Sequence, residues 1–242
     1  MDKEAEWTEE LCKARRAYYK QLAAYKANPV GKEPKHPNAL KARYAHNQVK
    51  ARLEEMFGPK CAYCEGSVKS VSYQHVEHFR PQSIYPRLAY HWENLLLACE
   101  QCNSVYKKHK FPLHDGSEPV EDQADPCSKD ASDLQMLINP CEEDPDDFFA
   151  FEDERLACKN ARAEKMRDVC GLNREALRDE RSVAVLLAEL AVKVYLAAVK
   201  DNIPEKITKS VADLKTITAA SMRFSGTIQA KVRALGIDYT QL

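Results

Sequence analysis

Two Cys-x-x-Cys pairs, Cys61–Cys64 and Cys99–Cys102, constrain the fold of this chain more than any other feature. Each pair places two thiols within one tight turn, and 34 residues separate the two pairs. Together they supply the four thiolates of a tetrahedral zinc site. Because cysteines fill all four positions, no position remains for water, and we expect the ion to stabilise structure and not to catalyse.

The other cysteines do not indicate a disulfide framework. The chain has nine cysteines, an odd number, and its first residues, MDKEAEWTEE, lack the basic and then apolar segments of a signal peptide. No stretch of 18 apolar residues without a charge is present. We therefore expect a cytoplasmic protein without a membrane partner, in which all nine cysteines are reduced. Coincidental thiols or a redox pair remain the alternative to zinc.

Charge is distributed unevenly along the chain. The formal net charge is −1, but residues 115–154 hold 15 of the 37 acidic residues and one of the 36 basic residues, Lys129. The remainder has 35 basic against 22 acidic residues, a formal charge of +13. This asymmetry is compatible with binding to nucleic acid but does not require it, because Lys and Arg on helix faces are commonly only solvated.

Amphipathic patterns predict helices on both sides of the cysteine pairs. Residues 7–27 carry apolar side chains at spacings of three and four, and residues 38–57 predict a second helix with Leu53 and Met56 facing inward. Within residues 173–200, the segment VAVLLAELAVKVYLAAV is apolar on nearly every face, which is typical of a helix that is buried or contacts a partner. One or two further helices are expected over residues 205–235.

The segments between these helices differ in composition. Residues 58–114 contain short apolar runs with clustered Cys and His, whereas the following residues are rich in Asp, Glu, Ser and Pro. We therefore expect a mainly α fold with a small α+β core. Its four regions are an N-terminal helical region (1–57), a zinc-stabilised core (58–114), an acidic irregular connection (115–155) and a C-terminal helical region (156–242).

The residues that suggest catalysis lie between the two cysteine pairs, in the segment His75-Val-Glu77-His78-Phe-Arg-Pro81. Hydrolysis of a phosphodiester requires a base to deprotonate water and a cation to stabilise charge on the phosphate. His78 suits the first role because imidazole titrates near neutrality, and Glu77 supplies the oxygen ligand that Mg²⁺ or Mn²⁺ prefers. Neighbouring residues on a regular strand point to opposite faces, so Glu77 and His78 can border one cleft only if the strand bends or ends there. Pro81, three residues after His78, favours such an end. The alternative is that His75 and His78 are partly buried residues at a strand edge, which is the more common role of a single histidine.

Together with the later segment from Trp92 to Asn103, these residues resemble the HNH endonuclease family. That family folds as two strands and a helix around one catalytic metal, a ββα-metal module often framed by four cysteines. By position, the resemblance implies His78 as general base, Glu77 and Asn103 as ligands of a catalytic Mg²⁺ or Mn²⁺, and Asn94 as the residue that organises the loop between the strands. The third letter of the HNH motif is Asn103 here and not His, a common departure. The catalytic metal then has fewer strong protein ligands and more coordination positions open to water and phosphate.

Three basic residues near this segment are weaker candidates for binding nucleic acid. Lys107 lies one helical turn after Asn103, and Lys107 and Lys108 are candidate phosphate contacts. A solvated basic helix end is an equal alternative for both. Arg80 is a candidate contact to the nucleic-acid backbone, with a structural role beside Glu77 as its alternative.

A narrower resemblance extends over residues 7–181. The segments EHFRPQSIYP, NPCEEDPDDFFAF and GLNREALRDER are similar to those of PtuB-type HNH proteins in Septu and related retron defence systems. The resemblance implies an effector of bacterial anti-phage defence and a PtuA-type partner ATPase of the ABC or SMC-like class. In retron systems a reverse transcriptase with its RNA–DNA product is a further partner. The apolar helix near residues 183–199 and the N-terminal helices are candidate docking surfaces for the ATPase.

Two functional classes follow from these patterns. The first is a metal-dependent endonuclease, with DNA as the favoured substrate and RNA as the alternative. The second is a zinc-stabilised nucleic-acid-binding or adaptor protein that uses the HNH scaffold without cleaving. The presence of Glu77, His78, Asn94 and Asn103 together favours the endonuclease, because a binding protein has no need of a base and metal ligands.

Overall fold

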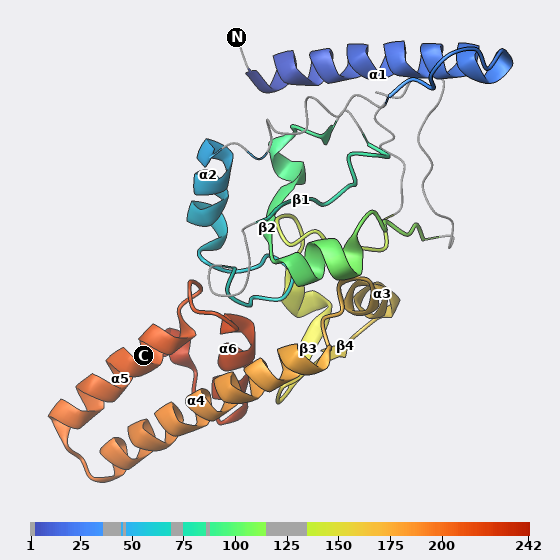
Figure 1. The fold of residues 1–242 in the computed structure, drawn as a ribbon. Helices are drawn as coiled ribbons and strands as arrows, with labels where there is room; N and C mark the ends of the chain where they lie inside the picture. Colours follow the sequence, from blue (N-terminus) through green and yellow to red (C-terminus); the bar gives the residue numbers. More distant parts are fainter. Residues whose placement is uncertain (1–2, 36–44, 46, 69–74, 86–87, 115–134) are drawn as a thin grey trace.

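The computed structural model describes residues 3–35, 45, 47–68, 75–85, 88–114 and 135–242 (Figure 1). The predicted fold class is confirmed, because helices predominate and two small two-stranded sheets accompany them. The helices and strands are α1 Lys3–Ala27, α2 Asn47–Phe57, β1 His75–His78, β2 Leu95–Ala98, the π-helix η3 Gln101–Lys107, β3 Phe149–Glu152, β4 Arg155–Cys158, α3 Ala161–Cys170, α4 Glu175–Lys200, α5 Pro204–Thr218 and α6 Ser225–Ala234.

The strands β1 and β2 form an antiparallel pair in which His75 lies opposite Ala98 and His78 opposite Leu95. All four residues of β2 are buried, as expected for an apolar run at the centre of a core. The segment after β2 supplies the helix of a ββα unit, but it is a seven-residue π-helix and not an α-helix. π-Helical turns are uncommon and concentrate at functional sites.

The N-terminal helices agree only in part with the predictions. α1 begins before residue 7 and runs to Ala27, while Leu11 packs in a small cluster with Ala89 and Tyr90. α2 begins at Asn47, and the predicted start near residue 38 lies outside the described residues. Leu53 is fully buried, as predicted. Met56 is 49% exposed and lines a pocket, so its predicted inward position is wrong.

Cys12 departs from the expectation that every cysteine is reduced. It is disulfide-bonded and buried. The expectation followed from the redox state of the cytoplasm, whereas a disulfide also depends on two Cβ atoms meeting at about 4 Å, which is a property of the tertiary fold.

The hairpin formed by β3 and β4 was not predicted, and it corrects the expectation that the connection is irregular up to residue 155. Phe149 pairs with Cys158 and Glu152 with Arg155. Along β3, half-buried and exposed residues alternate, which is the burial pattern of a strand with one face against the core. The chain reverses at Asp153, whose φ of 52° lies in the left-handed region that Asp tolerates better than most residues.

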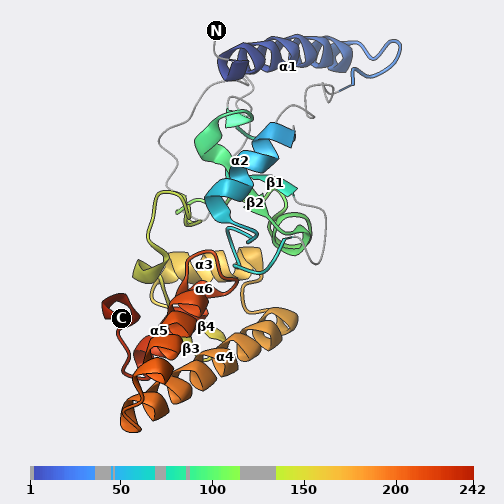
Figure 2. The same cartoon turned by 90° about the vertical axis from the view of Figure 1, so that its left-hand side faces the viewer.

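The C-terminal helices gather at one end of the molecule, and α1 lies at the opposite end (Figures 1 and 2). α5 and α6 both pack against α4, and α3 packs against η3 and β4. The sequence predicts one or two helices over residues 205–235, and the structure has two, α5 and α6. The ββ unit lies between the two ends, and one continuous core joins it to the C-terminal helices.

Gly171 marks the turn by which the chain leaves α3, and its replacement by alanine is expected to destabilise the protein. Its φ is 61°, and a Cβ atom here would lie 2.4 Å from the ring of Tyr106. Backbone strain and steric overlap together should cost about 2–4 kcal/mol. Gly236→Ala is the matched control, because Gly236 has a φ of 83° with no atom near its missing Cβ; it should cost about 1 kcal/mol. Urea unfolding of both variants measures the difference, and equal costs would contradict the role of Tyr106.

Candidate active site and zinc site

The four cysteines of the two pairs form one cluster, as the sequence predicts. Their Sγ atoms all lie within 4.8 Å of one another, and the described residues contain no other group of three or more His, Cys, Asp or Glu ligands. The first pair is held beside β2, because the amide of Ala62 donates a hydrogen bond to the carbonyl of Leu97 at 2.8 Å. A closed set of four buried thiols suits a structural zinc ion.

Arg174, at the start of α4, is a member of this site that the sequence analysis missed. Its guanidinium donates hydrogen bonds to Sγ of Cys102 at 3.5 Å and to Sγ of Cys64 at 3.7 Å. It also donates to the carbonyl of Gly171 at 3.1 Å and lies 5.7 Å from the ring centre of Tyr106. Four thiolates around Zn²⁺ carry two excess negative charges, so a cation at this position stabilises the cluster. Arg174 lies in the segment GLNREALRDER, far along the chain from both cysteine pairs, so no local pattern indicates its contact with the thiolates.

His78 is the last residue of β1 and is 7% exposed. Its Nε2 lies 2.8 Å from the carbonyl oxygen of Ala89. A carbonyl only accepts hydrogen bonds, so Nε2 carries the proton and Nδ1 carries the lone pair. Burial lowers the pKa of His78 to about 4. The imidazole is therefore neutral at pH 7, which is the state that a general base requires.

Glu77 points into the core, where it meets Lys107. Lys107 Nζ lies 2.6 Å from Oε1 of Glu77 and donates to the carbonyl of His78 at 3.1 Å. The hydroxyl of Tyr63 donates to the same Oε1 at 3.3 Å. Burial raises the pKa of Glu77, and the charge of Lys107 opposes this shift. The predicted contact of Lys107 with phosphate is wrong for this structure, because its side chain is fully buried as the partner of Glu77.

Asn94 links the two ends of the loop between β1 and β2. Its Oδ1 accepts from the amide of Arg80 at 2.7 Å, and its Nδ2 donates to the carbonyls of Arg80 and Leu88, each at 3.0 Å. The guanidinium of Arg80 donates to Gln135 at 2.8 Å and lies 5.1 Å from the ring centre of Phe111. These contacts favour the structural alternative for Arg80.

The remaining candidates lie on or beside η3. Asn103 is half-buried on this helix, and Lys108, which follows the helix, is exposed. The side chain of His75 is outside the described residues. The structure therefore brings Glu77, His78 and Asn94 to one end of the β1–β2 pair, with η3 directly after β2.

Comparison with known proteins identifies the family. Residues 61–111 match the model of the HNH endonucleases. The chain is 30% identical over 223 residues to Septu protein PtuB of Bacillus mycoides (strain KBAB4), which covers 81% of this chain and 73% of that protein. The chain belongs to the PtuB family of HNH endonucleases. Septu protein PtuB of Bacillus thuringiensis is 31% identical over 126 residues, 52% of this chain and 41% of that protein. No solved structure matches the chain significantly.

HNH nucleases use divalent metals, and the candidate ligands of this PtuB-family chain offer such an ion few protein donors. The contacts to Glu77 from Tyr63 and Lys107 both end on Oε1. Oε2 of Glu77 and the amide oxygen of Asn103 are hard donors of the type that Mg²⁺ or Mn²⁺ binds. Lys107 offsets the charge of the single carboxylate, so water and phosphate oxygens would have to supply most of the coordination shell.

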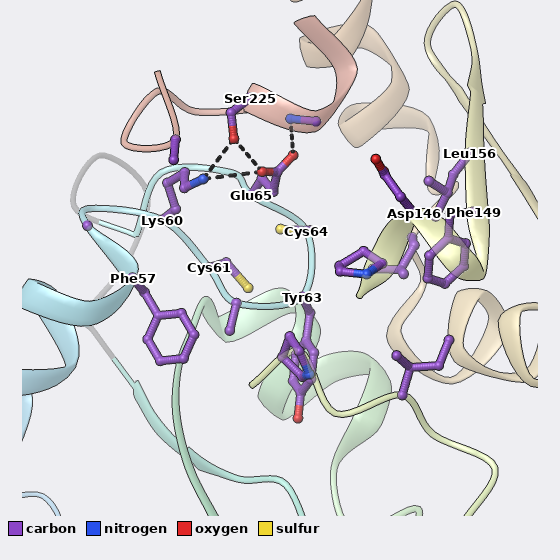
Figure 3. A pocket seen from close by; sticks show the side chains of 18 of the residues that line it. Phe57, Lys60, Cys61, Tyr63, Cys64, Glu65, Asp146, Phe149, Leu156 and Ser225 are labelled. Atoms are coloured by element: carbon purple, nitrogen blue, oxygen red, sulfur yellow. Dashed lines mark hydrogen bonds and ion pairs between the residues drawn. The ribbon is translucent and has the colours of Figure 1, made fainter. Parts of the chain in front are cut away.

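A pocket of about 600 Å³ lies on another side of the cysteine cluster and does not include His78, Asn94 or Asn103 (Figure 3). At its edge, the carboxylate of Glu65 accepts hydrogen bonds from the amide of Gly226 at 3.0 Å and the hydroxyl of Ser225 at 2.7 Å. A carboxylate at the first residues of a helix stabilises its positive end. The contact therefore joins the cysteine turn to α6, and the pocket is distinct from the candidate site of hydrolysis.

Replacing Arg174 by glutamine should weaken zinc binding. Loss of an outer partner of metal ligands typically lowers affinity by about 10–100-fold, and Arg174→Lys should retain part of it. Zinc transfer to a chromogenic chelator measures the effect, with Cys99→Ser as the reference for a lost ligand. Arg167→Gln is the matched control, because Arg167 contacts the sulfur of Cys158, which lies outside the cluster. Equal zinc retention in both arginine variants would contradict the assignment.

Lys107→Met should destabilise the protein by about 3–5 kcal/mol, because it leaves the buried carboxylate of Glu77 without its countercharge. The double variant Lys107→Met/Glu77→Gln should recover part of that loss, since both charges are then removed. Lys108→Met is the control and should stay within about 0.5 kcal/mol of the original protein, because Lys108 is exposed. Denaturant unfolding provides the measurement; a Lys107 variant as stable as the Lys108 variant would refute the buried pair.

Proposed function

We propose that this PtuB-family protein cleaves DNA by hydrolysing phosphodiester bonds, as the nuclease effector of a bacterial anti-phage defence system. The observation that carries the proposal is the state of His78: a neutral imidazole at the end of β1, with its proton on Nε2, inside the span that matches HNH endonucleases. A binding or adaptor protein has no need of a base poised in this way, so cleavage is favoured over that alternative.

In the proposed mechanism, Nδ1 of His78 accepts the proton of the attacking water. The hydrogen bond from Nε2 to the carbonyl of Ala89 fixes the tautomer and orients the ring, and it strengthens as the imidazole becomes charged. Asn94 bonds Arg80, which follows His78 in the chain, and Leu88, which precedes Ala89. It thereby holds His78 and Ala89 in position relative to each other. Each of these residues acts by placing the base at a fixed position beside the scissile phosphate.

A Mg²⁺ or Mn²⁺ ion held by Glu77 and Asn103 would stabilise the charge that develops on the phosphate and leaving oxygen. Lys107 and Tyr63 fix the carboxylate of Glu77 through Oε1. Lys108 is the remaining candidate for a phosphate contact, because it is exposed beside η3. Attack by water requires no 2′-hydroxyl, which favours DNA without excluding RNA as substrate.

The proposal includes a partner. The relatives of this chain bear the name Septu, and we propose a PtuA-type ATPase of the ABC or SMC-like class that holds or gates the nuclease. A retron reverse transcriptase with its RNA–DNA product is a further component to include in the assay. The deciding experiment incubates labelled DNA and RNA with the protein in Mg²⁺ or Mn²⁺, with and without a PtuA-type ATPase. Absence of cleavage under every condition would favour the adaptor alternative.

His78→Ala should reduce the cleavage rate by about 10²–10⁴-fold, because removal of a general base costs that much. Zinc content and the circular dichroism spectrum should remain those of the original protein, since His78 is not a zinc ligand. His109→Ala is the control, because His109 is exposed after the π-helix. Full activity of the His78 variant would refute its assignment as the base.

A further inference from the structure

One face of α4 is apolar and exposed. Val183, Leu186, Leu187, Leu190 and Val194, here called the α4 stripe, are between 37% and 59% exposed. Their spacing of three and four residues places them on one side of the helix, over a length of about 16 Å. The opposite side of α4 packs against α5 and α6 (Figures 1 and 2). Exposed apolar patches of this continuity mark interaction surfaces.

The stripe does not belong to a membrane-spanning helix in this fold. α4 is long and apolar enough to be a candidate span by composition, but its other face carries buried side chains such as Ala188 and Val192. Glu189 forms an ion pair with Lys231 of α6 at 3.0 Å, and Lys231 also bonds Asp153 of the hairpin at 2.8 Å. A span would expose all of these groups to lipid, which is costly. The stripe is therefore treated as a surface for contact with protein and not with lipid.

The exposed charges near the two ends of the stripe favour a partner with the reverse charge order. Asp179 and Glu180 precede the stripe, whereas Lys193 and Lys200 lie within its last residues and beyond it, and all four are exposed. An antiparallel copy of the same helix puts Val183 opposite Val194 of the other chain and brings the acidic end alongside the basic end. A parallel copy would place like charges together, which is unfavourable.

We propose that two copies of this protein associate through their α4 stripes, paired antiparallel about a two-fold axis. A two-fold contact requires a surface that is complementary to itself, and the stripe with its oppositely charged ends meets that requirement. Five side chains, each about half exposed, bury less than the roughly 1,200–2,000 Å² of a standard interface, so a weak and reversible dimer is expected. The pairing leaves the candidate active site on the β1–β2 unit uncovered.

Sedimentation velocity of the full-length protein over roughly 1–100 μM tests the proposal. The protein should shift from the 27.5 kDa chain mass towards twice that value as concentration rises. Leu190→Glu should raise the dissociation constant at least ten-fold, because it buries a charge at the centre of the interface. Leu235→Glu is the control, since Leu235 is 40% exposed but lies outside α4. Circular dichroism confirms that both variants are folded.

Cysteine crosslinking tests the orientation. Val183→Cys chains mixed with Val194→Cys chains of different tag length should form a disulfide-linked heterodimer under mild oxidation. Val183→Cys alone should not crosslink beyond the background of the original protein, because antiparallel pairing separates the two copies of residue 183. A protein that stays monomeric at the highest concentration, a dimer unaffected by Leu190→Glu, or efficient crosslinking of residue 183 to itself would each overturn the proposal.

Discussion

The fold depends on holding four thiolates at one point although they come from two separate segments of the chain. Thiolates repel one another, so their cluster persists only with cations to balance it. A zinc ion at this cluster would supply two positive charges, and Arg174, just before α4, supplies another. Glu65, beside the first cysteine pair, bonds the first residues of α6. The metal site therefore organises both the nuclease core and the attachment of the helices that follow it.

The candidate active site holds little net charge of its own. Glu77 is balanced by Lys107 at 2.6 Å, and His78 is neutral because burial disfavours its charged form. A site of this kind binds a divalent cation weakly until an anionic phosphate arrives, because the single carboxylate is already paired. Its chemistry would thus be coupled to the presence of nucleic acid.

The candidate site of hydrolysis, the cysteine cluster and the proposed dimer contact occupy different parts of the molecule. Hydrolysis is assigned to the end of the β1–β2 pair, zinc to the turn beside it, and self-association to the outer face of α4. Because Arg174, the residue just before α4, contacts the thiolates, α4 links the cysteine cluster to the proposed dimer contact. Loss of zinc would therefore be expected to disturb association as well as stability.

The sequence determined the four-cysteine metal site, the strand that ends at His78, the family and the helices after residue 173, because ligand spacing and apolar periodicity are local properties. It did not reveal the β3–β4 hairpin, the disulfide at Cys12 or the contact of Arg174 with the thiolates. Lys107 was the clearest error: one helical turn after Asn103 it looked like a surface cation, yet it is the buried partner of Glu77. Only the tertiary structure decided these points, since burial and ionic pairing depend on which distant segments meet, and a charge pattern alone does not specify its partner.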